Sequence, residues 1–168
     1  KQQLENFWEV YMKLVNENPQ TISGIAEKPQ HYMPVLADVD LKMEQHDDDD
    51  IRTLHSKEDI ERIIEIYQSV MRNIIDDCTD EYLTCVVLEK KPYWVDAGGK
   101  SYMKHGLHLH WPFCFMNKID QEVQLIPRVK KLMKETKMFE KVGYENSGDV
   151  IDKACCTNAW LLYGSRKL

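Results

Sequence analysis

The sequence of 168 residues predicts an α+β fold. Two kinds of apolar pattern alternate along it. Apolar residues three or four positions apart predict amphipathic helices, whereas shorter apolar runs bounded by Pro, Gly or Asn predict strands. Helical and strand-like segments follow one another in an order that is typical of helices packed on a sheet. Since 43% of the residues are apolar, we expect one compact domain over residues 1–168.

Helices are predicted in three segments. Residues 4–15 carry apolar side chains at helical spacing and end in a polar run before a proline. Ser56 and Asp59 resemble a capping box, and the apolar series over residues 60–75 predicts a long amphipathic helix. Residues 119–136 form the third predicted helix, which an internal proline breaks or restarts. We expect the first two helices to belong to the core.

Strands are predicted in five short apolar runs. These runs cover residues 35–41, 82–88, 106–115, 150–152 and 159–163. A long loop with one proline and two glycines connects the second run to the third. This connection predicts that the two runs form an antiparallel pair.

The overall charge is acidic, with 22 Lys and Arg residues against 28 Asp and Glu residues. The net charge of −6 argues against unspecific affinity for nucleic acid, which usually depends on a positive surface. The basic residues are nevertheless clustered, and one cluster covers residues 128–141. Contacts to phosphate would therefore come from local groups of cations.

The cysteines and the chain ends indicate the cellular context. Five cysteines without a CxxC pair favour a reducing compartment over a disulfide framework. The sequence has neither a run of about 18 apolar residues nor a signal-peptide pattern, so we expect a soluble intracellular protein without a membrane span. The chain starts at Lys1 and stops directly after a strand-like run, which indicates a fragment of a longer protein.

The first candidate site residues are Asp38 and Asp40, two positions apart in a predicted strand. Side chains at positions i and i+2 of a strand point to the same side. Two carboxylates in this arrangement suit a pair of divalent ions for phosphoryl transfer. Their neighbours are apolar, and burying both carboxylates without a metal or a basic partner would be costly. We therefore expect a metal site here.

Other candidates follow later in the chain. His108 and His110 share one face of their predicted strand, opposite the leucines that separate them. Asp152 follows an apolar pair and could supply a third carboxylate. The small turn and two cations within residues 163–167 suit a triphosphate clamp. A solvated basic chain end explains that last segment equally well.

Three motifs resemble those of the archaeo-eukaryotic primase superfamily in their order and spacing. They are Asp38-x-Asp40, Gly106-x-His108 and the apolar pair before Asp152. Residues 150–167 are particularly similar to the last motif of this family. The resemblance covers residues 34–167 and points to the primase modules that large nucleocytoplasmic DNA viruses fuse to a superfamily 3 helicase.

The resemblance implies an N-terminal α/β unit packed on an RRM-like unit, with mixed or antiparallel sheets and the active site between the units. Asp38, Asp40 and Asp152 would bind two Mg²⁺ or Mn²⁺ ions. His108 would contact the phosphates of the incoming nucleotide. Many members of the family have Ser where this chain has Gly106, so a backbone N–H would replace the missing hydroxyl.

The remaining implications concern the end of the chain and the partners. Ser165, Arg166 and Lys167 would bind the nucleotide and neutralise its triphosphate. The expected activity is primer synthesis on a single-stranded DNA template from nucleoside triphosphates, as a DNA primase or primase-polymerase. A helicase, fused C-terminally or associated, would be its partner, and the place of action would be a viral replication site in the host cytoplasm.

A second family matches the same histidines. His108-Leu109-His110 resembles the His-hydrophobic-His signature of HUH-type rolling-circle replication endonucleases, which bind one metal between the two histidines. That family needs a tyrosine nucleophile on a helix. Tyr163 lies in a strand-like run and Tyr144 in a loop, so neither residue fits well. The primase hypothesis is favoured because it also explains the three aspartates.

Two further alternatives use other residues. A structural zinc site is conceivable, although the ligand spacing matches no common zinc template. Its ligands would be His108, His110, Cys114 and one of Cys155 and Cys156. The other alternative is a non-catalytic nucleic-acid-binding module, in which Tyr93, Trp94 and Trp111 would stack on bases. A place in the core is favoured more strongly for Trp111 than for Trp94.

Overall fold

A computed structural model describes residues 1–18, 24–45, 50–162 and 165. The chain divides into two compact units. We call residues 1–29 with 158–168 the terminal unit and residues 30–157 the sheet unit, and we describe each by itself. The mixture of helices with antiparallel strands confirms the α+β fold class.

The terminal unit contains one helix and one small strand pair. Helix α1 (Gln2–Glu17) confirms the first predicted helix, and strand β1 (Ala26–Glu27) pairs antiparallel with β7 (Trp160–Leu161). The hydroxyl groups of Tyr11 and Ser165 form a hydrogen bond of 2.9 Å. Tyr11 is the buried residue of α1. The expectation that this helix belongs to the core is therefore wrong for most of its apolar residues. Its exposed apolar residues are Leu4, Phe7, Trp8, Val10 and Met12.

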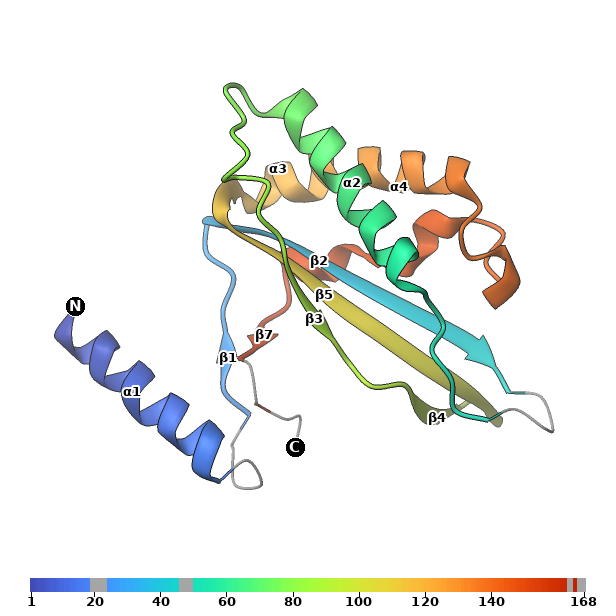
Figure 1. Cartoon of the computed structure of the whole chain (residues 1–168), viewed down its shortest axis with the longest axis horizontal. Coiled ribbons are helices and arrows are strands. Elements are labelled where there is room, and N and C mark those ends of the chain that lie inside the picture. Colours follow the sequence, from blue (N-terminus) through green and yellow to red (C-terminus); the bar gives the residue numbers. More distant parts are fainter. Residues whose placement is uncertain (19–23, 46–49, 163–164, 166–168) are drawn as a thin grey trace. The chain divides into compact units, whose positions relative to one another are not determined.

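The sheet unit is built on an antiparallel five-stranded sheet of order β3-β5-β2-β6, with β4 also paired to β5 (Figure 1). Its strands are β2 (Tyr32–Glu44), β3 (Val86–Glu89), β4 (Tyr93–Ala97), β5 (Lys100–Asn117) and β6 (Ile151–Asp152). The predicted strands therefore exist, although β2 and β5 are longer than predicted and β3 is shorter.

Strand β4 was not predicted, because its residues were assigned to a loop. It forms a hairpin with β5 through Gly98 and Gly99, whose φ angles are +62° and +78°. Two consecutive residues with positive φ give the tight turn that matches the twist of paired strands, and glycine adopts them without strain.

Strands β2 and β5 form the longest pairing of the sheet. Their register is continuous from Val35 opposite Trp111 to Glu44 opposite Tyr102, and a bulge follows between Val35 and Pro34. The buried side chain of Gln121 stabilises this irregularity. Its Nε2 donates to the carbonyl oxygens of Met33 and Pro34, and its Oε1 accepts from the N–H of Leu36.

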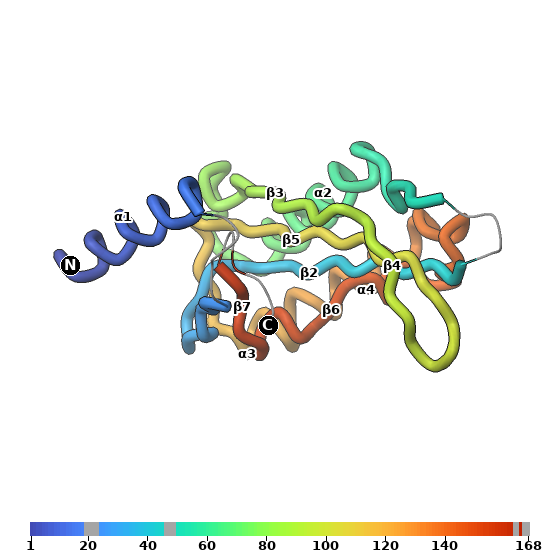
Figure 2. Tube along the Cα trace, turned by 90° about the horizontal axis from the view of Figure 1, so that it is seen from below, coloured from blue at the N-terminus to red at the C-terminus, as the bar shows by residue number. Residues whose placement is uncertain are grey.

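Helices cover one face of the sheet, as both views show (Figures 1 and 2). Helix α2 (Lys57–Ile74) begins with the predicted capping box of Ser56 and Asp59. Its Tyr67 ring stacks on Trp111 of β5 with 5.0 Å between the centroids, and both residues are fully buried. Trp111 is therefore a core residue and cannot offer a base-stacking surface.

The third predicted helix is divided into three parts. These are α3 (Lys118–Asp120), a π-helical turn η1 (Gln121–Leu125) and α4 (Ile126–Thr136). Pro127 lies in the first turn of α4, where its missing N–H costs nothing, so the proline restarts the helix as predicted. Short 3₁₀ turns follow as η2 (Glu140–Val142), η3 (Ser147–Val150) and η4 (Lys153–Cys156). Among the helices of the described residues, none combines the length and apolar character needed to cross a membrane.

A buried group on the helix-covered face joins β3, β5 and the segment before α2. The rings of His55 and His105 stack with centroids 4.1 Å apart, and their Nε2 atoms lie 3.4 and 3.2 Å from Oε1 of Glu89. The N–H of Leu54 donates to Nδ1 of His105. The proton of the neutral His105 ring is therefore on Nε2, which points to Glu89.

Acid should destabilise the fold through His105. Burial and the neighbouring His55 lower the pKa of His105 by more than Glu89 raises it. The unfolded chain then takes up a proton more readily than the folded one, so stability is complete above about pH 6.5 and is lost as the pH falls below that value. We expect the thermal midpoint to drop between pH 7.5 and 5.5, and the drop to be smaller in His105→Asn.

The matched control is His31→Gln, which changes an exposed histidine. This variant should keep the pH dependence of the native chain. An identical pH dependence in the native chain and in His105→Asn would contradict the assignment.

Candidate active site on the open face of the sheet

The face of the sheet opposite α2 and α4, here called the open face, carries the predicted aspartates. Along β2, Asp38 and Asp40 alternate with Val39 and Leu41, which are completely buried. The side chains of Asp38 and Asp40 are 23% and 40% exposed. Both carboxylates therefore lie on the same side of β2 and reach solvent, as their spacing predicted.

Strand register brings His108 and Asp152 to Asp38. His108 of β5 is opposite Asp38 on one side, and Asp152 of β6 is opposite it on the other side. Directly opposed residues of antiparallel strands hold their Cβ atoms about 5 Å apart on the same face. The row His108–Asp38–Asp152 thus unites residues from three distant parts of the sequence. One oxygen of Asp152 accepts from the N–H of Ala154, which orients the carboxylate.

Gly106 is opposite Asp40, and the space there explains the glycine. A Cβ atom at this position would lie 2.7 Å from Oδ1 of Asp40 and 3.0 Å from the carbonyl oxygen of Val39. Any side chain would therefore displace the Asp40 carboxylate or push the strands apart. Glycine at position 106 is therefore required for the observed place of the Asp40 carboxylate.

Lys104 is a site residue that the sequence analysis missed. It precedes Gly106 by two positions and shares the open face with it, and its Nζ lies 3.3 Å from Oδ2 of Asp40. Partial burial lowers the pKa of Lys104, but the Asp40 carboxylate raises it by more, so the amine is charged. The alternation Lys104, Gly106 and His108 along β5 was the signal that could have revealed it.

The electrostatic environment keeps Asp38 ionised. Burial raises the pKa of its carboxyl, but the His108 ring and the charges of Lys90 and Lys104 lower it by more. Oδ1 of Asp38 is buried, lies 3.4 Å from Nε2 of His108 and has no well-formed hydrogen bond with the described residues. A charged oxygen in this condition is costly unless a further positive group contacts it.

The donor set on the open face suits hard divalent cations. Carboxylate oxygens are the ligands that Mg²⁺ prefers, and the ionised, poorly satisfied Asp38 fits such an ion. The three aspartates do not by themselves form a closed ligand shell. Among the described residues, the group of three whose ligand atoms lie within 4.8 Å of one another is instead His55, Glu89 and His105.

That histidine group could hold a metal only after a change of protonation. Because Leu54 donates to Nδ1 of His105, the Nε2 atom carries a proton, and a cation would have to displace it. The contacts of both Nε2 atoms with Oε1 of Glu89 already explain the arrangement.

Tyr144 completes the edge of β2 beside the site. Its hydroxyl accepts from the N–H of Lys42 at 2.8 Å and donates to the carbonyl oxygen of Asp40 at 3.4 Å. Strand β6 ends its pairing at Asp38 and Val39, so the tyrosine takes over the next backbone groups of β2. This contact fixes the backbone on which Asp40 is carried.

The other predicted site residues are placed differently. Arg166, Lys167 and Tyr163 lie outside the described residues, and Ser165 belongs to the terminal unit. His110 is opposite Leu36, on the same face as His108. The ligands of the alternative zinc site do not form a group among the described residues, which argues against that alternative. Cys155 is instead within hydrogen-bond distance of the Leu36 carbonyl oxygen.

Comparison with known proteins identifies the family. All 168 residues match the family described as "C962R protein N-terminal AEP domain". The chain is 32% identical over 173 residues to "Putative helicase 121R" of Invertebrate iridescent virus 3, which covers 96% of the chain and 17% of the viral protein. It is 30% identical over 176 residues to "Putative helicase 184R" of Invertebrate iridescent virus 6, which covers 97% of the chain and 18% of that protein.

The chain thus spans less than a fifth of the length of these relatives. The family match agrees with the three motifs found in the sequence, which lie together on one face of one sheet. The chain belongs to the family of the C962R protein N-terminal AEP domain, one of the archaeo-eukaryotic primase domains.

Proposed function

We propose that this chain synthesises primers on a DNA template by metal-dependent nucleotidyl transfer. The observation that carries the proposal is the row His108–Asp38–Asp152, in which β5, β2 and β6 bring the residues of three separate motifs into register. Membership of the primase family supports the reaction class. In a purely structural sheet this row would be unfavourable, because the carboxylates of Asp38 and Asp152 lie side by side and repel each other.

Asp38, Asp40 and Asp152 would hold two divalent ions, Mg²⁺ or Mn²⁺. When bound, such ions activate the attacking hydroxyl and offset the charge of the phosphates. The chain prepares this site in advance. Its Asp38 carboxyl is ionised because its pKa is lowered, and Gly106 leaves the space that the Asp40 carboxylate needs.

The residues around the carboxylates would bind the nucleotide. His108 is positioned by Asp38 and would donate to a phosphate oxygen, as a neighbour of the reacting group. Lys104 pairs with Asp40 and would turn to the triphosphate once cations neutralise that carboxylate. Ser165, Arg166 and Lys167 remain proposed contributors from the end of the chain.

The longer protein would couple this activity to a helicase. Both viral relatives are named as helicases and are more than five times as long as the matched segment. We propose a C-terminal helicase, a single-stranded DNA template and nucleoside triphosphates as partners. The place of action would be a viral replication site in the host cytoplasm.

The endonuclease alternative finds little support in the sheet unit. Its tyrosine nucleophile should lie on a helix beside the two histidines, but Tyr67 of α2 is buried on the opposite face against Trp111. The Tyr144 hydroxyl is engaged with the backbone of β2. Tyr163 lies outside the described residues, so a variant at this position is needed to test it.

The first prediction concerns the aspartates. Asp38→Asn should reduce template-dependent incorporation of labelled nucleotides about a hundredfold or more, because the charge that holds the cations is removed while the shape is kept. Incorporation is measured on a single-stranded template with Mg²⁺ or Mn²⁺. The matched control is Asp96→Asn in the exposed β4 hairpin, which should retain full activity.

The same assay separates the two enzyme classes. The native chain should form no covalent protein–DNA adduct, and Tyr163→Phe should retain nucleotide incorporation. Template nicking with an adduct that depends on Tyr163 or Tyr144, without nucleotide incorporation, would refute the primase proposal.

A second prediction concerns Gly106. Gly106→Ala should lower incorporation about tenfold or more, because the new Cβ displaces the Asp40 carboxylate. The effect should be non-additive with Asp40→Asn, since both changes act on one group. Additive losses in this double-mutant cycle would show that Gly106 does not act through Asp40, and circular dichroism would report any loss of fold.

A third prediction concerns Lys104. Lys104→Met should raise the KM for the nucleoside triphosphate about tenfold, because one charge-assisted contact to phosphate is lost. The control is Lys91→Met, which removes an exposed cation from the loop between β3 and β4. Equal KM values for both variants would exclude a role of Lys104 in nucleotide binding.

A further inference from the structure

Two aromatic residues are exposed at one end of the open face. Tyr32 and Phe115 are each 63% exposed, and Phe113 of β5 is 51% exposed, whereas Trp111 of the same strand is buried. Phe115 is opposite Pro34, and Tyr32 is opposite Asn117. Tyr32, Pro34 and Asp38 are separated by even numbers of positions on β2, so they lie on the same face of the strand. Phe115, opposite Pro34, lies on this face too, which is the face that carries the candidate site. We call Tyr32 and Phe115 the aromatic pair.

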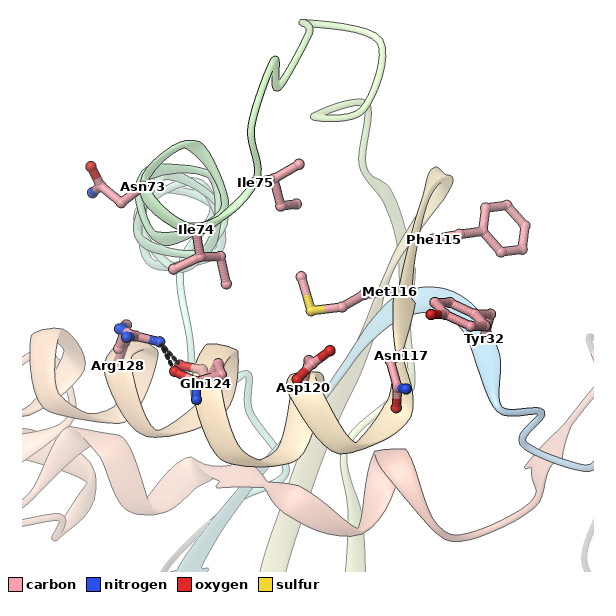
Figure 3. A pocket seen from close by; sticks show the side chains of 10 residues that line it. All are labelled: Tyr32, Asn73, Ile74, Ile75, Phe115, Met116, Asn117, Asp120, Gln124 and Arg128. Carbon is pink, nitrogen blue, oxygen red and sulfur yellow. Dashed lines mark hydrogen bonds between the residues drawn. The ribbon is translucent and has the colours of Figure 1, made fainter.

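Figure 3 shows the placement of the two rings. Both project from one side of the β2–β5 ladder, and Met116 lies on the other side with Ile74 and Ile75. Both rings also line the rim of a pocket of about 560 Å³, whose other walls include Met116, Ile74 and Ile75 on the helix side. Neither ring therefore contributes to the apolar layer beneath the helices.

The Tyr32 ring is held in place by its neighbours. The His31 ring meets it edge-on with centroids 5.1 Å apart, and Asn117 is hydrogen-bonded to His31 at 3.2 Å. A large ring that is both exposed and fixed loses little conformational freedom when a ligand stacks on it. Exposure combined with a fixed position is typical of a binding surface. A role of the Tyr32 ring in the core would not account for its exposure.

The open face is also divided by charge. Lys104 and Lys42 lie on one side of the His108–Asp38 row, and the aromatic pair lies on the other side. Asp38 and Pro34 are four positions apart on β2, a distance of about 13 Å along a strand. A nucleotide strand extending from the site in this direction would place its bases near the rings, with the nucleotide phosphates toward the lysines.

We propose that the aromatic pair binds the unpaired template strand by stacking on its bases. This inference rests on the proposed function of the same face. Stacking requires bases that are not already paired, so the occupant is single-stranded DNA. The net charge of −6 fits this mode, because an acidic chain gains little from the phosphate backbone and must obtain affinity from uncharged contacts.

The test is binding of a fluorescein-labelled oligo-dT strand to the 168-residue chain, followed by anisotropy. Phe115→Ala and Tyr32→Ala should each weaken binding about tenfold, and Phe115→Trp should restore it, because any aromatic ring can stack. The matched control is Tyr82→Ala, which removes an exposed tyrosine from the turn after α2 and should leave affinity unchanged.

Salt dependence distinguishes stacking from charge. The losses in Phe115→Ala and Tyr32→Ala should be the same at about 50 and about 200 mM salt, because a ring releases no counterions. A duplex hairpin of equal length should bind the native chain and Phe115→Ala equally.

Two outcomes overturn the inference. One is a native chain that does not bind oligo-dT, and the other is unchanged affinity in the Tyr32→Ala/Phe115→Ala double variant. In the second case, incorporation that is lost in Asp38→Asn but normal in the double variant would leave the proposed primase function standing. Weakened binding in the double variant would support the aromatic pair even if the chain alone incorporated no nucleotide.

Discussion

The open face depends on the register between β2 and β5. Val39 and Leu41 on β2 and Leu107 on β5 are completely buried beneath the helices. A shift of one residue would turn them toward solvent and bury Asp38 and Asp40 in their place, which costs far more than any single contact. The apolar face of the sheet therefore determines where each polar group of the other face lies.

The same alternation separates two kinds of histidine on β5. His105 faces the helices, where the backbone of Leu54 and the carboxylate of Glu89 fix its tautomer. His108 is three residues further along and faces the carboxylate of Asp38. His105 and His108 are an odd number of positions apart, so the strand presents them to opposite faces and they contact different groups. The group behind the sheet joins strands, and we propose that the row in front of it binds ligands.

Charge is balanced locally although the chain as a whole is acidic. Lys90 and Lys104 act on Asp38, and Lys104 pairs with Asp40, so two cations already compensate the exposed carboxylates. Divalent ions in this place would release Lys104 for the phosphates of a nucleotide. The net charge of −6 limits unspecific attraction to DNA, so recognition would be concentrated on one face of one sheet.

The sequence by itself determined the α+β class, the capped helix α2 and the shared side of Asp38 and Asp40, because these follow from periodicity over a few residues. It did not reveal β4, whose pairing depends on a glycine turn, or the exposed apolar face of α1. Only the tertiary structure decided that Asp152 lies opposite Asp38, that Lys104 reaches Asp40 and that Gly106 must lack a side chain. Those relations arise between strands far apart in the chain, where register and packing rather than local pattern set the distances.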